Sequence, residues 1–226
     1  MPSPSGGKSG AASQFPEGRS HPPNKRKFYI VRHRVVSNTH GFILQNKEAL
    51  FQGRAPIYVD PFGPRGFRDY PEVPLFIADK RRGRIHWDLE EIPGCWFISD
   101  RMKMVLEPLD PGAFAFVKCK VQLPDGSDAA VRWLCDVVRV LDALDEEKSD
   151  IDIRTATDGS KYYSLSRNFN LAFKEDVVGQ NDRFFRLKYF RDEVICDEQV
   201  KLACKAAAFA GPRFEAAWVK PIFHRQ

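Results

Sequence analysis

The chain has 226 residues, and its formal net charge of +5 is concentrated at one end, because residues 1–27 hold five lysines and arginines against one glutamate. That leaves a nearly neutral body, long enough to bury a self-sufficient core. Such a body argues against a nucleic-acid-binding domain, which spreads basic residues over one face. No run reaches the roughly 18 apolar residues of a membrane-spanning helix.

Residues 1–26 are rich in proline, serine and glycine and have almost no large apolar side chains. Such a composition cannot bury enough surface to offset the entropy cost of ordering. We therefore expect a disordered basic tail over residues 1–26 and a single α+β domain over residues 27–226. The tail contains no apolar stretch of the length that a secretory signal requires.

The β-prone run at residues 28–31 predicts the first strand. Residues 52–74, with many prolines and glycines and interspersed aromatic residues, predict a long ordered loop.

Two later strand-like runs end at a small polar or acidic residue and continue with helical spacing. Residues 96–98 lead to Ser99, a favoured N-cap, and residues 194–196 lead to Asp197. Apolar residues then recur at i, i+3, i+4 and i+7, which predicts two amphipathic helices. These residues are Met102, Val105, Leu106 and Leu109 in the first helix, and Val200, Ala203, Cys204 and Ala207 in the second. The similarity fits either an internal duplication or two ordinary transitions that use the same capping physics.

Further segments have the alternation or β-branched and aromatic content of strands. They are 113–121 and 131–135, which form a hairpin around a turn at 124–127; 151–153 and 162–165, which form a second hairpin; and 168–173 and 184–187. In the first hairpin we expect one face to be apolar and the other to carry Lys118 and Lys120. Strands outnumber helices, so the sequence predicts an α+β fold with a mixed, largely antiparallel sheet.

Catalytic and metal-binding signatures are absent from the sequence. The five histidines are scattered without zinc-ligand spacing, so we expect no metal, no cofactor and no small-molecule substrate. The five cysteines form no C-x-x-C pair and lie mostly in apolar runs, as buried free thiols do, which predicts a reducing, cytoplasmic environment. The basic run at 80–84 is interpreted as a hairpin tip rather than a phosphate site.

Two alternatives stay open. One is a small α+β enzyme with an unrecognised carboxylate site, or with Cys95 or Cys196 beside His40 or His86. The other is a secreted effector or regulator that uses its basic tail.

Residues 142–152 carry six acidic side chains and one lysine. Such a run is either a solvated loop or a recognition surface that meets a basic cleft on another protein. The apolar residues Leu144 and Ile151 would anchor it. The predicted partner-binding residues are Asp142, Asp145, Glu146, Glu147 and Asp150.

Several short motifs follow one another in a distinctive order: WFISDR at 96–101, LEPLDPG at 106–112, VRVLDALDEEKS at 138–149, FRL at 185–187 and GPRFE at 211–215. This order resembles the immunity protein family numbered eleven of bacterial polymorphic toxin systems, formerly a domain of unknown function. The likeness extends over roughly residues 28–220, and the LDALDE segment at 141–146 is its most distinctive part.

The resemblance implies a non-enzymatic α+β protein of the bacterial cytosol that binds and neutralises a cognate toxin, usually encoded beside it. No catalytic residues are carried over from the family. The chain departs from the family pattern at Cys196, where the second motif often has serine, and in its basic tail.

Overall fold

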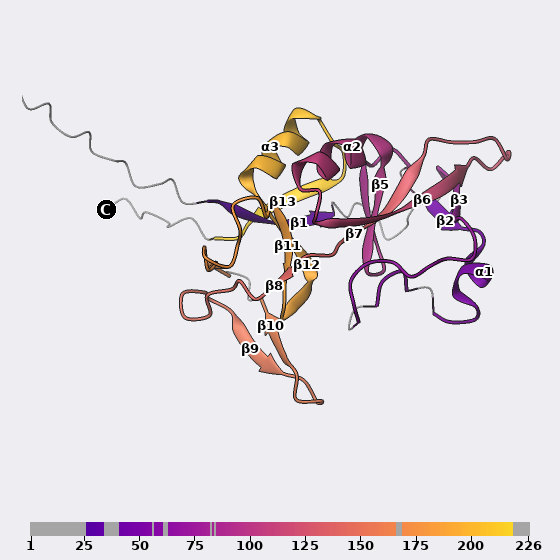
Figure 1. Ribbon diagram of the computed structural model, residues 1–226. Coiled ribbons are helices and arrows are strands. Elements are labelled where there is room, and N and C mark those ends of the chain that lie inside the picture. The colour runs from indigo at the N-terminus through magenta and orange to yellow at the C-terminus, as the bar shows by residue number, and fades with distance from the viewer. Residues whose placement is uncertain are drawn as a thin grey trace, which may run out of the picture.

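The computed structural model describes residues 26–33, 41–55, 57–60, 63–81, 83, 85–165 and 169–218, and the tail up to residue 25 lies outside this part. The described residues form a six-stranded sheet, a five-stranded sheet, a two-stranded arm and three helices (Figure 1). The helices are α1 (Lys47–Phe51), α2 (Asp100–Leu109) and α3 (Glu198–Ala206).

The strands alternate in direction almost throughout. The six-stranded sheet has the order β2 (Phe42–Leu44), β3 (Leu75–Ala78), β6 (Phe114–Gln122), β7 (Arg132–Val137), β5 (Cys95–Ser99) and β4 (Leu89–Ile92). The five-stranded sheet has the order β13 (Pro212–Ala216), β1 (Phe28–His33), β12 (Phe190–Asp197), β11 (Phe184–Leu187) and β8 (Val140–Leu141). The arm consists of β9 (Asp152–Thr155) and β10 (Lys161–Ser164). Only β3/β6 and β8/β11 run parallel among these pairs, so the predicted α+β fold with a largely antiparallel sheet is confirmed.

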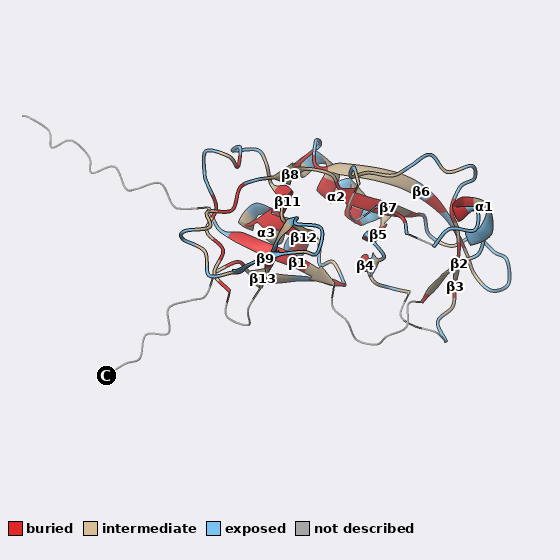
Figure 2. Cartoon of the chain, turned by 90° about the horizontal axis from the view of Figure 1, so that it is seen from below, coloured by how far each residue is buried: buried red, intermediate tan, exposed pale blue. Residues whose placement is uncertain are grey.

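Helices α2 and α3 lie side by side over both larger sheets (Figure 1). One apolar core is built from both helices and both sheets, with Met102 and Leu106 from α2 and Val200 and Cys204 from α3. Because neighbouring strand residues point to opposite faces, the other face of each sheet supports a second apolar cluster. Figure 2 shows buried residues in the central strands β1, β5 and β12. Each sheet is therefore covered on both faces.

The two predicted helix caps are confirmed. The Ser99 hydroxyl accepts a hydrogen bond from the Met102 amide at 3.2 Å, and the Asp197 carboxylate accepts one from the Val200 amide at 3.1 Å. Ser99 is therefore the structural counterpart of Asp197. Helix α3 ends at Ala206 although the alanine run continues, because Ala208 has a positive φ of 50° that stops the helix.

Two units of the fold each consist of a hairpin followed by a helix: β4, β5 and α2 form the first, and β11, β12 and α3 form the second. The end of each helix forms hydrogen bonds with the start of the other unit's hairpin. At the end of α3, the Ala210 carbonyl accepts from the Asp88 amide at 2.7 Å, and the Ala210 amide donates to the Asp88 carboxylate at 2.8 Å, just before β4. At the end of α2, the buried carboxylate of Asp110 accepts from the amides of Arg183 and Phe184 at 2.8 and 2.9 Å, where β11 begins. Each helix thus fixes the start of the other unit's hairpin.

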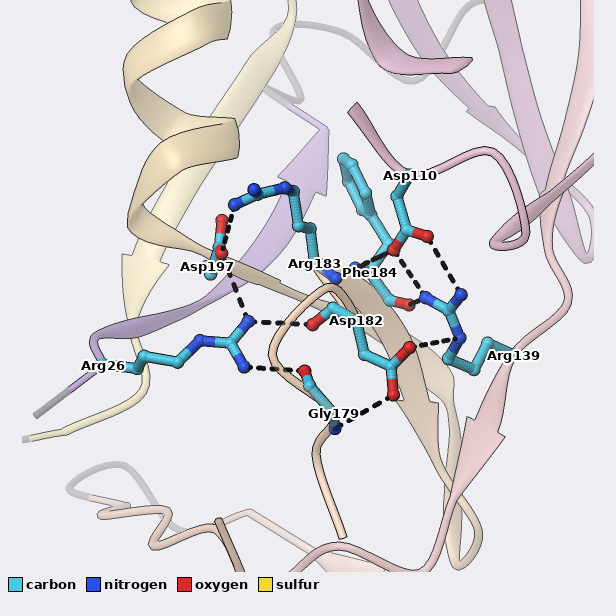
Figure 3. Close-up of polar contacts among 8 residues, drawn as sticks. All are labelled: Arg26, Asp110, Arg139, Gly179, Asp182, Arg183, Phe184 and Asp197. Atoms are coloured by element: carbon cyan, nitrogen blue, oxygen red, sulfur yellow. Dashed lines mark hydrogen bonds and ion pairs between the residues drawn. The ribbon is translucent and has the colours of Figure 1, made fainter. Parts of the chain in front are cut away.

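Figure 3 shows the polar cluster around this second junction. Arg139 donates to both oxygens of Asp110 and also lies 3.2 Å from Asp182. Arg26 donates to the Gly179 and Asp182 carbonyls at 3.0 and 2.9 Å and to Asp197 at 3.2 Å. Arg26, the last residue of the expected tail, therefore contacts the folded residues.

The long loop after α1 has the predicted ordered character in its described residues. The Tyr70 hydroxyl donates to the Tyr58 carbonyl at 3.2 Å. Arg65 forms an ion pair with the fully buried Asp136, which also accepts from the Gly66 amide at 2.8 Å. The sequence indicated the aromatic anchors of this loop but not its ion pair.

Four local expectations need correction. Helix α1 was not predicted, because five residues are too short for a clear apolar period. The segment 169–173 makes two isolated bridges instead of a strand, and residue 168 lies outside the described part. Residues 82 and 84 of the run at 80–84 lie outside the described part, and its other residues do not join two paired strands, because β3 and β4 are not neighbours in the sheet.

The fourth correction concerns β6, which has no single apolar face. Phe114 and Phe116 pack on the shared core, whereas Cys119 and Val121 pack on the cluster across the sheet. Lys118 and Lys120 continue the face of the two phenylalanines, because all four positions have the same parity along the strand.

Glu90 in β4 predicts a pH-dependent stability. It is 2% exposed, and burial raises its pKa from 4.5 to about 7 against the opposing charge of Arg132. A raised carboxyl pKa means that the folded state holds a proton that the unfolded state releases, so stability falls as pH rises from 4.5 to about 7. Relative to Glu90→Gln, we expect the native protein to lose about 3 kcal/mol over this range. Urea unfolding of both proteins between pH 5 and 8 measures this difference, and parallel pH profiles would contradict it.

Candidate functional site

The predicted acidic segment connects β8 to β9 at the end of the five-stranded sheet. Its anchors are as expected: Leu144 is 1% exposed and Ile151 packs against the adjoining apolar cluster. The backbone is held by hydrogen bonds from the Asp145 amide to the Ala172 carbonyl at 2.9 Å and from the Lys174 amide to the Ala143 carbonyl at 2.8 Å. The segment is therefore a fixed surface feature rather than a loose linker.

Three of the five predicted partner-binding residues are engaged in ion pairs within the chain. Asp142 lies 3.3 Å from Lys188 and Asp145 lies 2.6 Å from Lys148. Glu146 pairs with Lys161. Glu146 also accepts from the Tyr163 hydroxyl at 2.5 Å. Hydrogen bonds from Lys148 and Lys161 lower the pKa values of Asp145 and Glu146 respectively. The carboxylates of Asp145 and Glu146 are therefore charged, and each of the three acids already lies beside a lysine ammonium group.

The other two residues, Glu147 and Asp150, differ from them. Both are exposed, and within the described part of the chain neither side chain forms an ion pair. Their carboxylates keep their hydrogen-bonding capacity for water or for a partner. The structure thus brings all five acids onto one segment, and among the described residues Glu147 and Asp150 are the two of them that form no ion pair.

Behind the acidic segment, its lysine partners lie against aromatic rings. The ammonium groups of Lys161 and Lys188 lie 4.6 and 5.0 Å from the centroid of the Tyr189 ring, and Tyr163 packs edge-on to Tyr189 at 5.5 Å. Such contacts add a cation–π attraction to each ion pair. The same residues line a hollow of about 520 Å³ between β10 and the β11–β12 turn. Sequence reasoning missed these lysines and tyrosines because they join the acids only through the fold.

Three other hollows lie elsewhere on the described part of the molecule. One, of about 580 Å³, is lined by the loop after α1 and includes Arg54, Arg65 and Arg68. The second, of about 450 Å³, lies between Arg26, Phe173 and Trp218. The third, of about 360 Å³, includes Cys119 of β6, but none of the three is lined by Cys95, Cys196 or a histidine.

The cysteines suggested for an enzyme lie inside the protein. Cys95 and Cys196 are 2% and 0% exposed, and burial raises the pKa of both thiols well above the usual value. A protonated thiol without access to solvent is a poor nucleophile. His86 is exposed, and His40 lies outside the described residues. These cysteines therefore behave as core residues, as their apolar sequence context indicated.

Among the described residues, no three His, Cys, Asp or Glu side chains are grouped so that they could hold a metal ion. No helix in the same part of the chain is long and apolar enough to cross a membrane.

The fold is that of an α+β protein with apolar clusters on both faces of its two larger sheets. The most distinctive feature of its surface is the anchored acidic segment beside the projecting β9–β10 arm. A family model described as the immunity protein family Imm11 matches residues 27–219, which is most of the chain. The chain therefore belongs to this immunity protein family, and the resemblance noted in its motifs is confirmed. Membership implies toxin neutralisation in general. A search of curated proteins found no match.

Proposed function

We propose that this protein neutralises a bacterial toxin, encoded beside it, by binding that toxin directly in the cytoplasm of the producing cell. The observation that carries the proposal is the match of an immunity protein family to residues 27–219. An anchored surface segment and buried, protonated thiols support action by contact rather than by turnover. A rigid patch that takes part in an interface of about 1,600 Å² in total is enough for stable inhibition.

We further propose that the acidic segment lies on the inhibitory surface, with Glu147 and Asp150 as its contact residues. These two carboxylates can meet a basic toxin cleft without first breaking an internal ion pair. Asp142 and Glu146 have a different part: they pair with Lys188 and Lys161, which lie outside the segment, whereas Asp145 pairs with Lys148 within it. Complementary charge of this kind mainly raises the association rate.

The variant Glu147→Lys/Asp150→Lys tests this surface. We expect its association with the toxin at low ionic strength to be about tenfold slower, because attraction becomes repulsion. The difference should shrink as salt is added. Its thermal stability should match that of the native protein, because neither side chain has a described ion-pair partner. Stopped-flow or surface-based kinetics at several salt concentrations measures the rate.

The matched control is Glu48→Lys/Asp128→Lys, which makes the same net charge change in α1 and in the connection between β6 and β7. These side chains are 80% and 74% exposed. The control should associate at close to the native rate. If both double variants slow association equally, only net charge matters and the acidic segment is not the contact surface; protection of growth by the native protein would still support toxin neutralisation.

A further inference from the structure

The β9–β10 arm projects from the side of the molecule opposite α2 and α3 (Figure 1). All four residues of β9 are exposed, and β9 pairs with β10 alone. On its inner side, β10 is tied to the body, because the Tyr163 amide donates to the Tyr189 carbonyl at 2.8 Å. The outer side of β9 is therefore a sheet edge with no strand beside it in the described structure.

The hairpin ladder fixes which backbone groups this edge presents. Ala156 donates to the Ser160 carbonyl at 2.8 Å, and the register continues through Arg154↔Tyr162 and Ile153↔Tyr163. In an antiparallel pair, hydrogen-bonded and non-hydrogen-bonded positions alternate. The N–H and C=O groups of Ile153 and Thr155 therefore point outward, away from β10. They form no hydrogen bond with any described residue, so the edge offers donors and acceptors to an added strand.

We propose that this edge pairs with the β9 edge of a second copy of the chain, in an antiparallel arrangement with a twofold axis at Ile153. In this register Ile153 lies opposite its own copy, with both outward backbone groups of each residue satisfied. Asp152 then lies opposite Arg154 of the second copy, and Arg154 opposite its Asp152. Two such arms form a four-stranded sheet, and the contact is of the same-patch type that twofold dimers require.

Charge selects this register over its neighbours. A slip that centres the pair on Asp152 or on Arg154 places like charges directly opposite each other, which is destabilising in a sheet. Within one chain Asp152 and Arg154 lie 3.2 Å apart, and the register centred on Ile153 joins the two intrachain pairs into one network of four alternating charges on one face. On the other face it covers Ile153, which is 50% exposed, with its own copy. The sequence Asp-Ile-Arg is thus self-complementary about its middle residue.

The pairing segment is short, and it buries much less than the roughly 1,000 Å² of a stable interface. We therefore expect a weak dimer that forms at high protein concentration. This inference does not depend on toxin binding.

Charge exchange tests the dimer. By sedimentation velocity over a rising concentration series, the native full chain should dimerise, whereas Asp152→Arg and Arg154→Asp should each weaken self-association by about tenfold. A mixture of the two single variants should dimerise again, because each supplies the charge that the other lacks. The double variant Asp152→Arg/Arg154→Asp should dimerise as the native chain does. Circular dichroism confirms that each variant is folded.

A cysteine placed on the axis provides a second measurement. All five native cysteines are buried, so Ile153→Cys supplies an accessible thiol that should form a disulfide-linked dimer with copper phenanthroline as oxidant. Thr155→Cys, whose thiol would lie far from its own copy in this register, should remain largely monomeric. A native chain that stays monomeric up to its solubility limit, single variants that dimerise like the native chain, or equal cross-linking of both cysteine variants would each overturn the proposal.

Discussion

Replacement of Asp110 by alanine is expected to lower the free energy of unfolding by about 3–5 kcal/mol, the usual cost of removing one partner of a buried ion pair. Asp110 is 3% exposed, and its carboxylate accepts from Arg139 and from two backbone amides at the start of β11. Alanine leaves the two amides without their acceptor in a site that water does not reach freely, and Arg139 keeps only Asp182 and the Phe184 carbonyl. The loss should appear as a lower urea midpoint monitored by circular dichroism.

Glu107 on the same helix is the matched control. Its side chain is 47% exposed, and it pairs with Lys103 one turn earlier. Exposed pairs of this spacing contribute about 0.3–0.5 kcal/mol, so Glu107→Ala should be nearly neutral. If the two variants unfold at the same urea concentration, the Asp110 junction does not hold the two units together as described.

Replacement of Gly211 by alanine is expected to cost about 3 kcal/mol or more, because strain and a steric clash add up. Gly211 lies in the turn between α3 and β13 with a φ of 110°, a conformation that side-chain-bearing residues rarely adopt. A Cβ at this position would lie 2.4 Å from the carbonyl oxygen of Leu89 in β4. The turn or β4 must move to accommodate it, which disturbs the contact between the two units.

Gly126→Ala is the control that separates the cost of backbone strain from the cost of the steric clash. Gly126 also has a positive φ, of 85°, but a Cβ there would meet nothing within 4 Å. Gly126→Ala should therefore cost only the backbone strain of about 1 kcal/mol. Thermal or urea unfolding of both variants measures the difference. Equal destabilisation would show that the close approach to Leu89 contributes nothing.

Local chemistry explains which parts of the fold were predictable. The caps at Ser99 and Asp197, the apolar helix stripes and the turn-linked hairpins each depend on residues close in sequence. The parallel pairs β3/β6 and β8/β11 do not, because they join segments with long stretches of chain between them. The reciprocal junctions at Asp110 and Ala210 likewise depend on tertiary placement, and no local pattern indicates them.

The candidate site shows the same division. The composition of residues 142–152 predicted an anchored acidic segment, and the burial of Leu144 agrees with that. The sequence could not predict that Lys161 and Lys188 compensate Glu146 and Asp142, because the fold brings β10 and the β11–β12 turn to them. Because three of the five predicted acids form ion pairs within the chain, we propose the remaining two, Glu147 and Asp150, as the contact residues.

The most direct test is to co-express the full chain with the toxin encoded by the neighbouring gene in a sensitive host and to isolate both proteins together. We predict restored growth and a stable complex that contains both chains, with a toxin that is chemically unaltered when the complex is dissociated. Absence of a complex together with unprotected growth would contradict neutralisation by binding. Protection accompanied by covalent alteration of the toxin would show that this protein acts as an enzyme.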